Sequence, residues 1–173
     1  VLCKPYEPEE RSLDTNKWYG ARMAAKKAEI LSSNGKFDFV FLGDSITHFW
    51  EENPWTGVDG ARELEKLTKK YSILNLGYGG DRTENVLWRL QNGQADGYTA
   101  KCMMLMIGTN NGAGPIEDVA RGVGAIIDFW RSKHPESKIL LVSVLPRDIY
   151  PGDENRKRME KLNVLTERFV DGI

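Results

Sequence analysis

Short apolar runs alternate with longer amphipathic segments along the 173-residue chain. Four runs rich in large apolar residues stop at turn-forming residues, which is typical of strands buried in a sheet. These predicted strands cover residues 37–45, 72–76, 103–107 and 138–145. Only Asp38 interrupts the first run, which stops abruptly at Gly43-Asp44-Ser45. Ser45 is therefore expected at the carboxyl end of a largely buried strand.

Between these runs, apolar residues recur every three or four positions, which predicts helices with one buried face. The predicted helices cover residues 14–34, 46–50, 61–70, 83–90, 116–132 and 154–170. Strands that alternate with helices indicate a parallel sheet. We therefore expect one α/β domain over residues 1–173, built as three layers, α/β/α. Because Pro5 and Pro8 do not suit a helix interior, residues 1–14 are expected to form an extended arm on its surface.

The composition narrows the classes of partner. With 24 Lys and Arg against 25 Asp and Glu, the chain has no excess positive charge to attract nucleic acid or an anionic membrane. No apolar stretch approaches the roughly 18 residues that a membrane span needs. Two cysteines are too few for a disulfide framework. Since the chain begins with Val1, a secreted or periplasmic location is expected over a cytoplasmic one.

Small and polar residues gather where three of the predicted strands end. Gly43-Asp44-Ser45 closes the first strand, Asn75 to Asp81 follows the second, and Gly108-Thr109-Asn110-Asn111 follows the third. In open α/β sheets, ligands bind in the crevice outside the carboxyl ends of the strands. Ser45 is therefore the candidate nucleophile. Its backbone N–H would lie at the start of the helix predicted from Ile46, where negative charge is favoured.

Each of these stretches has a simpler reading. Gly43-Asp44-Ser45 alone could be a turn with a helix cap, Asp44 more readily anchors a loop than acts as a base, and Asn110 could bond its own backbone in a turn. Gly77-Tyr78-Gly79-Gly80 could be a dinucleotide-binding turn, but that fingerprint would require glycine where this sequence has Arg82. The three stretches together favour a catalytic crevice.

In order and separation, the three stretches resemble the first three sequence blocks of the SGNH (GDSL-type) hydrolases. With Gly80-Asp81-Arg82-Thr83 they are most similar to the branch with platelet-activating-factor acetylhydrolase catalytic subunits and bacterial acetyl esterases, and the resemblance covers most of residues 37–146. It implies a flavodoxin-like sheet with Ser45 as nucleophile. It also implies an oxyanion hole formed by the Ser45 N–H, the Gly80 N–H and the Asn110 side-chain amide, with no metal or cofactor.

The general base is missing from this pattern. The family carries it in an Asp-x-x-His block near the C-terminus, and this sequence contains no such block. Its two histidines are His48, one helical turn beyond Ser45, and His134, expected on the surface at the opposite edge of the sheet. Neither is expected within reach of the Ser45 hydroxyl. The domain is therefore expected to be C-terminally incomplete, to lack its last strand, and to have little activity by itself.

The resulting hypothesis is a serine esterase that removes a small acyl group, acetyl above all, from a carbohydrate. Trp50, Trp55, Tyr78 and Trp88 could form a wall on which sugars stack, although aromatic residues at helical spacing often belong to the core. The alternative is a carbohydrate-binding or assembly module, or an inactive fragment, that keeps the crevice but lacks the base. The partner is expected to be a small acyl ester, and the oligomeric state stays open.

In either case, the Ser45 N–H, the Gly80 N–H and the Asn110 amide are expected to reach one point near the Ser45 hydroxyl, at hydrogen-bond distances of about 3 Å.

Overall fold

A computed structural model describes residues 4–11, 17–53, 56–57, 59–112 and 114–170. Its strands are β1 (Lys36–Gly43), β2 (Ile73–Gly77), β3 (Thr99–Met106) and β4 (Lys138–Leu141). They form one sheet in the order β2-β1-β3-β4, and every pair is parallel. The predicted α/β class and parallel sheet are therefore confirmed, and the strand order is that of flavodoxin-like folds.

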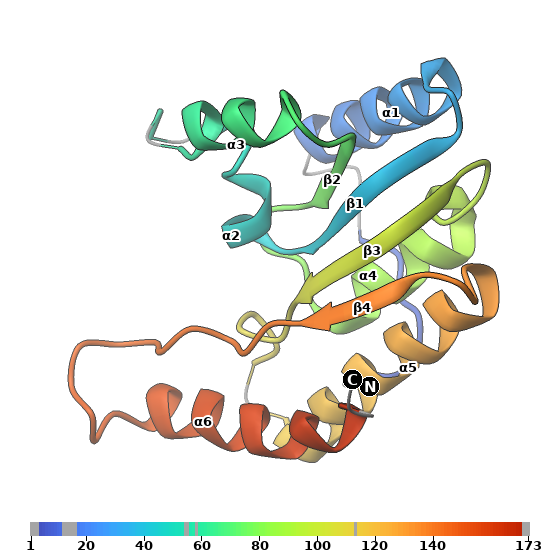
Figure 1. The fold of residues 1–173 in the computed structure, drawn as a ribbon. Coiled ribbons are helices and arrows are strands. Elements are labelled where there is room, and N and C mark those ends of the chain that lie inside the picture. Colours follow the sequence, from blue (N-terminus) through green and yellow to red (C-terminus); the bar gives the residue numbers. More distant parts are fainter. Residues whose placement is uncertain (1–3, 12–16, 54–55, 58, 113, 171–173) are drawn as a thin grey trace.

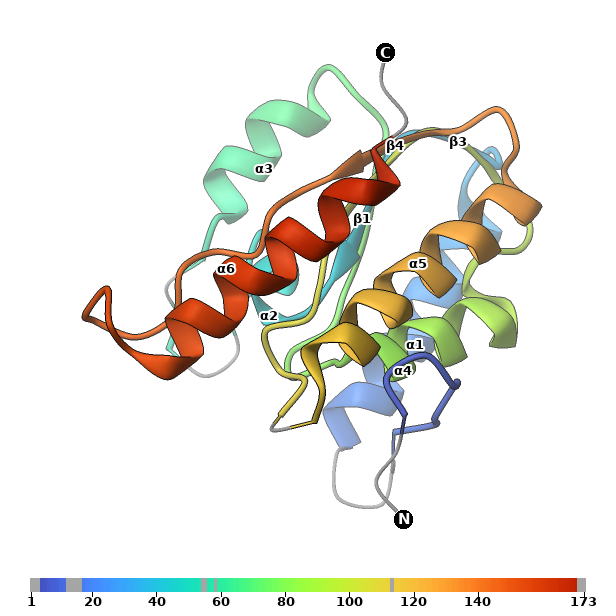
Figure 2. The same cartoon turned by 90° about the horizontal axis from the view of Figure 1, so that it is seen from below.

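The helices are α1 (Lys17–Ser32), α2 (Ser45–His48), α3 (Ala61–Thr68), α4 (Thr83–Arg89), α5 (Ile116–Lys133) and α6 (Glu154–Thr166). A π-helical turn, η1 (Leu90–Gln94), continues α4, and a 3₁₀ turn, η2 (Glu167–Phe169), continues α6. In Figures 1 and 2, α1, α4 and α5 lie on one side of the sheet, α3 lies on the other, and α6 runs beside α5. These are the three expected layers.

The main core lies between the sheet and the layer of α1, α4 and α5. Alternate residues of β1, β2 and β3 point into it, because successive side chains of a strand face opposite sides. The fully buried members on the strands are Val40, Leu42, Leu74, Leu76, Met103 and Leu105. A smaller cluster joins α5 to α6 through Val119, Met159 and Leu162. Burial of these apolar faces stabilises the sheet. The sheet in turn positions the loops at its carboxyl edge.

Several predicted boundaries were wrong by a few residues. The first strand ends at Gly43 rather than Ser45, because the Asp44 carboxylate accepts the Ile46 N–H at 2.9 Å and so starts α2 at Ser45. The fourth strand ends at Leu141 rather than residue 145. Beyond it, the side chain of Asn163 on α6 bonds the N–H and the carbonyl of Val144, at 2.7 and 3.0 Å, and draws the chain away from the sheet.

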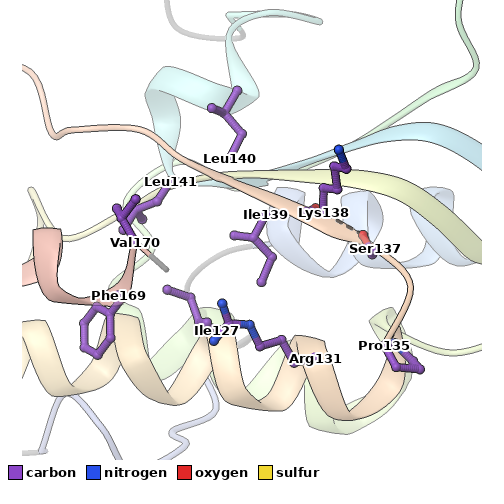
Figure 3. A pocket seen from close by; sticks show the side chains of 10 residues that line it. All are labelled: Ile127, Arg131, Pro135, Ser137, Lys138, Ile139, Leu140, Leu141, Phe169 and Val170. Atoms are coloured by element: carbon purple, nitrogen blue, oxygen red, sulfur yellow. Dashed lines mark hydrogen bonds between the residues drawn. The ribbon is translucent and has the colours of Figure 1, made fainter. Parts of the chain in front are cut away.

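The outer edge of β4 borders an apolar groove of about 620 Å³. Figure 3 shows Ile127 and Arg131 of α5 on one side of it, Ile139 and Leu141 of β4 on another, and Phe169 near the end of the described chain. Within the described residues, β4 is an edge strand with β3 as its partner. Leu140 is 53% exposed. The lateral edge of the sheet along β4 is therefore much more exposed to solvent than the part of the sheet formed by β1 and β2.

Among the described residues, no helix is long and apolar enough to cross a membrane.

Candidate functional site

The three predicted stretches all lie at the carboxyl edge of the sheet. Ser45 is the first residue of α2, directly after the end of β1 and its Asp44 cap. Gly80 lies in the loop between β2 and α4, and Asn110 lies in the loop that follows β3. Because β1 is flanked by β2 and β3, the Ser45 turn lies between the other two loops. Ser45 and Asn110 are half-buried and Gly80 is exposed, so solvent reaches this edge.

Hydrogen bonds tie the Gly80 loop to the Ser45 turn. The Tyr78 N–H donates to the Gly43 carbonyl at 3.1 Å, and the Asn75 side chain donates to the Thr47 carbonyl at 2.8 Å. A methyl group on Gly77 would collide with the backbone of Thr47 and His48, so only glycine allows α2 to pack this closely on the end of β2. The loop itself turns at Gly80, whose φ of +78° also favours glycine.

Hydrogen bonds from the β3 loop reach the Gly80 loop from the other side. The Asn110 side-chain amide donates to the Asp81 carbonyl at 3.0 Å. Asn111 is buried, accepts the Thr83 N–H at 3.1 Å and donates to the Glu84 carboxylate at 2.7 Å. The Gly80 loop is therefore held from both sides, by the turn after β1 and by the loop after β3.

A buried ion pair also stabilises the Gly80 loop. Asp81 and Arg89 have fully buried side chains and approach each other to 2.8 Å. Burial raises the pKa of Asp81, and the Arg89 charge opposes that rise. Arg89 also bonds Gln94 and lies 4.0 Å from the centre of the Tyr78 ring. We gave Arg89 no role from the sequence. An arginine inside the apolar run of α4 was the signal that it must have a buried partner.

The donors expected to form the oxyanion hole remain available. Within the described residues, the N–H groups of Ser45 and Gly80 donate to no protein acceptor. The Asn110 amide has two N–H groups, and one bonds the Asp81 carbonyl. Their convergence at about 3 Å around the Ser45 hydroxyl stays a prediction. The chemistry that such an edge supports is stabilisation of negative charge on an oxygen beside Ser45.

Asp44 serves the turn, as expected, by capping α2. Burial raises its pKa to about 6, while the bond from the Ile46 N–H and the charge of Arg147 oppose the rise. The other neighbour of Ser45 in the sequence, Ile46, has no carboxylate. Asp44 is thus an anchor whose oxygen is already engaged by the backbone.

Comparison with known proteins identifies the family to which this chain is related. The sequence model of the GDSL-like lipase/acylhydrolase family matches residues 41–171, which include all three loops. The chain belongs to this family. The alpha2 subunit of platelet-activating factor acetylhydrolase IB from Homo sapiens is 33% identical over 129 residues, which cover 74% of this chain and 52% of that protein. The alpha1 subunit from Bos taurus is 30% identical over 135 residues, 78% of this chain and 54% of that protein.

The chain thus spans about half the length of the curated relatives it matches. Solved structures agree on the fold at lower identity. An acetyl xylan esterase, AlAXEase, superposes with a TM-score of 0.56 at 18% identity, covering 79% of this chain and 72% of that one. A lipase/acylhydrolase from Enterococcus faecalis gives a TM-score of 0.52 at 18% identity, covering 77% and 69%. The resemblance to SGNH hydrolases, first seen in the three motifs, is confirmed.

His48 of this GDSL-like chain points toward the loop after β2. Its Nδ1 accepts the Gly79 N–H at 3.3 Å, its Nε2 faces Glu52 at 3.6 Å, and Trp18 stacks on the ring. Because Nδ1 is an acceptor, the neutral ring carries its proton on Nε2. Burial and the nearby charge of Arg22 lower the pKa to about 4. His48 is therefore neutral and structural, and that neither nitrogen reaches the Ser45 hydroxyl stays a prediction.

His134 was expected on the surface, and that prediction was wrong. It lies directly after α5, at the opposite edge of the sheet as expected, but it is only 6% exposed. Its ring stacks on Trp130 at 4.2 Å and on Tyr98 at 5.2 Å between centroids. Burial lowers its pKa. The sequence alone did not show that these two aromatic rings cover the imidazole.

The proposed aromatic wall also needs correction. Tyr78 is fully buried against Arg89 and Tyr19, so no sugar can stack on it. Trp50 packs edge-on against Phe41, and Trp88 is half-buried on α4. Trp55 lies outside the described residues. Tyr78 is therefore excluded from such a wall, and a role for Trp50 and Trp88 in it stays a prediction.

A polar pocket of about 300 Å³ adjoins Asn110 on the side of β3 away from β1. Arg147, from the loop after β4, and Arg158, from α6, line it together with Asn110. No sequence pattern indicated a role for these arginines, because residues 110, 147 and 158 are distant in the chain and come together only in the folded protein.

Proposed function

We propose that this protein is a serine esterase that removes small acyl groups, above all acetyl, from carbohydrate esters through an acyl-enzyme on Ser45. The observation that carries the proposal is the mutual bonding of the three loops at the carboxyl edge. The turn after β1, the loop after β2 and the loop after β3 are held together by hydrogen bonds from Tyr78, Asn75 and Asn110. This arrangement supports a nucleophile flanked by donors from both neighbouring strands.

In the proposed reaction, the Ser45 Oγ attacks the ester carbonyl carbon and loses its proton to a base. The carbonyl oxygen becomes negative and is stabilised by the Ser45 N–H, the Gly80 N–H and the Asn110 amide. The carbon–oxygen bond to the alcohol breaks, the alcohol leaves with a proton, and the acyl group stays on Ser45. Water then attacks this ester, releases the acid and restores the hydroxyl.

The acyl group and alcohol are proposed from the names of similar proteins. The curated relatives are platelet-activating factor acetylhydrolase subunits, and one structural neighbour is an acetyl xylan esterase. Both names support acetyl as the acyl group. A carbohydrate alcohol is proposed over a phospholipid, and the test is direct: acetylated xylan should be deacetylated faster than an acetylated phospholipid. The reverse order would exclude the carbohydrate assignment.

Neither histidine of the chain is proposed as the base for this reaction, because His48 bonds the Gly79 loop and His134 lies at the far edge of the sheet. This observation favours a second candidate, a module that binds acyl esters without cleaving them. The two candidates make different predictions for the chain in solution, so one assay separates them.

The assay is hydrolysis of p-nitrophenyl acetate with and without added imidazole, which can act as a base from solution. Because imidazole itself cleaves this ester, the rate without protein is subtracted at each imidazole concentration. A slow protein-dependent reaction that imidazole accelerates in the wild type, but not in Ser45→Ala, would support the esterase. Fast hydrolysis without imidazole that Ser45→Ala abolishes would support it too and would show that another group serves as base. Binding of acetylated xylan without any Ser45-dependent hydrolysis would favour the binding module.

A further inference from the structure

Two arginines in the pocket beside Asn110 have no acidic partner. Arg147 donates to the Thr109 carbonyl at 2.6 Å, and Arg158 donates to the Gly114 carbonyl. Within the described residues, neither has a carboxylate within 4.0 Å, whereas Arg22, Arg89 and Arg121 each have one. A backbone carbonyl orients a guanidinium group but does not neutralise its charge. Among the described residues, neither guanidinium group is thus paired with a carboxylate, although the charge of Arg147 acts on Asp44 and that of Arg158 acts on Glu117.

The lining of this pocket fits an anion. It is polar, holds no carboxylate, and places three asparagines, Asn110, Asn111 and Asn155, around the two arginines. Two acids of the adjoining surface are paired with lysines: Glu154 with Lys157 at 3.3 Å, and Glu117 with Lys161 at 2.6 Å. In addition, the Nε–H of Arg158 is buried and has no hydrogen-bond partner in the described part of the chain. A buried donor without an acceptor costs stability unless a ligand satisfies it.

The pocket is also connected to the candidate reaction centre. Asn110 is part of its wall, and the same amide is a proposed oxyanion donor. The charge of Arg147 acts on Asp44, the neighbour of Ser45. A volume of about 300 Å³ is enough for a compact charged group at the low end of small-molecule sites. A group held there would belong to the same ester whose carbonyl lies at Ser45.

We propose that this pocket binds an anionic group on the alcohol part of the ester, a carboxylate or a phosphate, through Arg147 and Arg158. The planar guanidinium group matches both anions by paired hydrogen bonds. The inference rests on the proposed function and narrows it, because it names the substrate class as charged acetyl esters. A uronic acid unit and a phosphorylated alcohol are the two sources of that chemistry.

The kinetic test uses three acetyl esters of matched size: an acetylated methyl glucuronoside, its neutral methyl ester, and acetyl glycerol phosphate. The readout is the ratio of kcat/KM for each charged ester to that of the neutral ester. We expect a ratio of about 10 to 100 in the wild type, as hydrogen bonds to charged groups imply. Arg147→Gln and Arg158→Gln should each bring it close to one. The better charged ester identifies the source of the anion.

Arg156→Gln is the matched control, because Arg156 lies one half-turn away on α6, pairs with Glu160 at 3.6 Å and does not line the pocket. It should leave the ratio at the wild-type value. Equal rates for charged and neutral esters in the wild type would overturn the inference. So would a loss in the two arginine variants that affects all three esters equally.

A binding experiment separates this inference from the proposed function. Inorganic phosphate and methyl glucuronate are titrated by NMR into Ser45→Ala and into the same protein with Arg147→Gln or Arg158→Gln. Binding that depends on both arginines would support the anion site even if no ester were hydrolysed, in which case the proposed function alone fails. Hydrolysis at equal rates for charged and neutral esters, together with no arginine-dependent binding, would exclude the anion site and support the esterase.

Discussion

The two halves of the carboxyl edge of this sheet are built differently. At the ends of β1, β2 and β3, the loops are short, and buried polar groups bond them to one another, with Asp81 and Arg89 at the centre. Beyond β4, at the same edge, the chain runs through exposed residues 145–150. Donors that must stay fixed during a reaction belong in the first half, since preorganised dipoles stabilise charge without rearrangement.

The buried pair offers the sharpest way to break this contrast. Arg89→Met leaves the buried Asp81 carboxylate with only the longer contact to Arg11, at 3.5 Å, so we expect a loss of about 3 to 5 kcal/mol in the free energy of unfolding. Urea denaturation measures it. Lys133→Met, which removes an exposed pair with Asp96, should cost less than about 1 kcal/mol. Similar losses in both variants would mean that the Asp81 loop is not specially supported.

Asn110→Ala should separate catalysis from stability. Removing one oxyanion donor costs about 3 to 4 kcal/mol of transition-state stabilisation, a loss of two to three orders of magnitude in kcat. Steady-state hydrolysis of p-nitrophenyl acetate measures this loss. The control is Asn163→Ala on α6, which removes the two bonds to Val144 beyond β4. It should lower stability by about 1 to 2 kcal/mol and leave kcat unchanged. An Asn110→Ala variant with full kcat would exclude Asn110 from the oxyanion hole.

His48 should make the first half sensitive to acid. Its pKa of about 4 in the folded protein lies below the usual 6.5, so the unfolded chain binds the proton more tightly. The stability that it contributes is complete above about pH 6.5 and is lost as the pH falls toward 4, by on the order of 2 kcal/mol. His48→Gln should remove this dependence in urea unfolding at pH 4.5, 5.5 and 7. An unchanged pH profile would show that His48 is already charged or exposed.

Asp44 gives the opposite sign over an overlapping range. Its pKa of about 6 lies above the usual 3.8, so its contribution is greatest below about pH 4 and is lost as the pH rises toward 6. Asp44→Asn keeps an oxygen to cap α2 and removes the charge. Relative to the wild type, this variant should therefore gain stability from pH 4.5 to pH 6.5. A constant difference across that range would contradict the burial of Asp44.

The smallest effect is expected at the β4 edge. Leu140 is 53% exposed, so Leu140→Ala should change the free energy of unfolding by less than about 1 kcal/mol. Leu105, which is fully buried on the neighbouring strand β3, should cost about 2 to 5 kcal/mol when changed to alanine. Calorimetry of the two variants measures the contrast. A large loss at Leu140 would mean that this face of β4 is covered in solution.

Local patterns predicted the parts of the fold that local chemistry decides. The apolar runs identified all four strands, and the small residues at their ends placed Ser45, Gly80 and Asn110 at one edge. Partners distant in sequence were out of reach. Asn163 ends β4 from α6, Trp130 and Tyr98 bury His134, and Arg147 meets Arg158 only through the packing of α6 on α5. No periodicity along the chain encodes such encounters.

The hydrogen bonds between the three loops have a consequence for the order of synthesis. Every residue of that network, from the Arg11 that bonds the Gly79 carbonyl to the Asn111 that bonds Glu84, precedes β4 in the chain. A ribosome makes the N-terminal part of a domain first. The polypeptide can therefore form the hydrogen bonds between the Ser45 turn, the Gly80 loop and the Asn110 loop while β4 and the residues after it are still being translated.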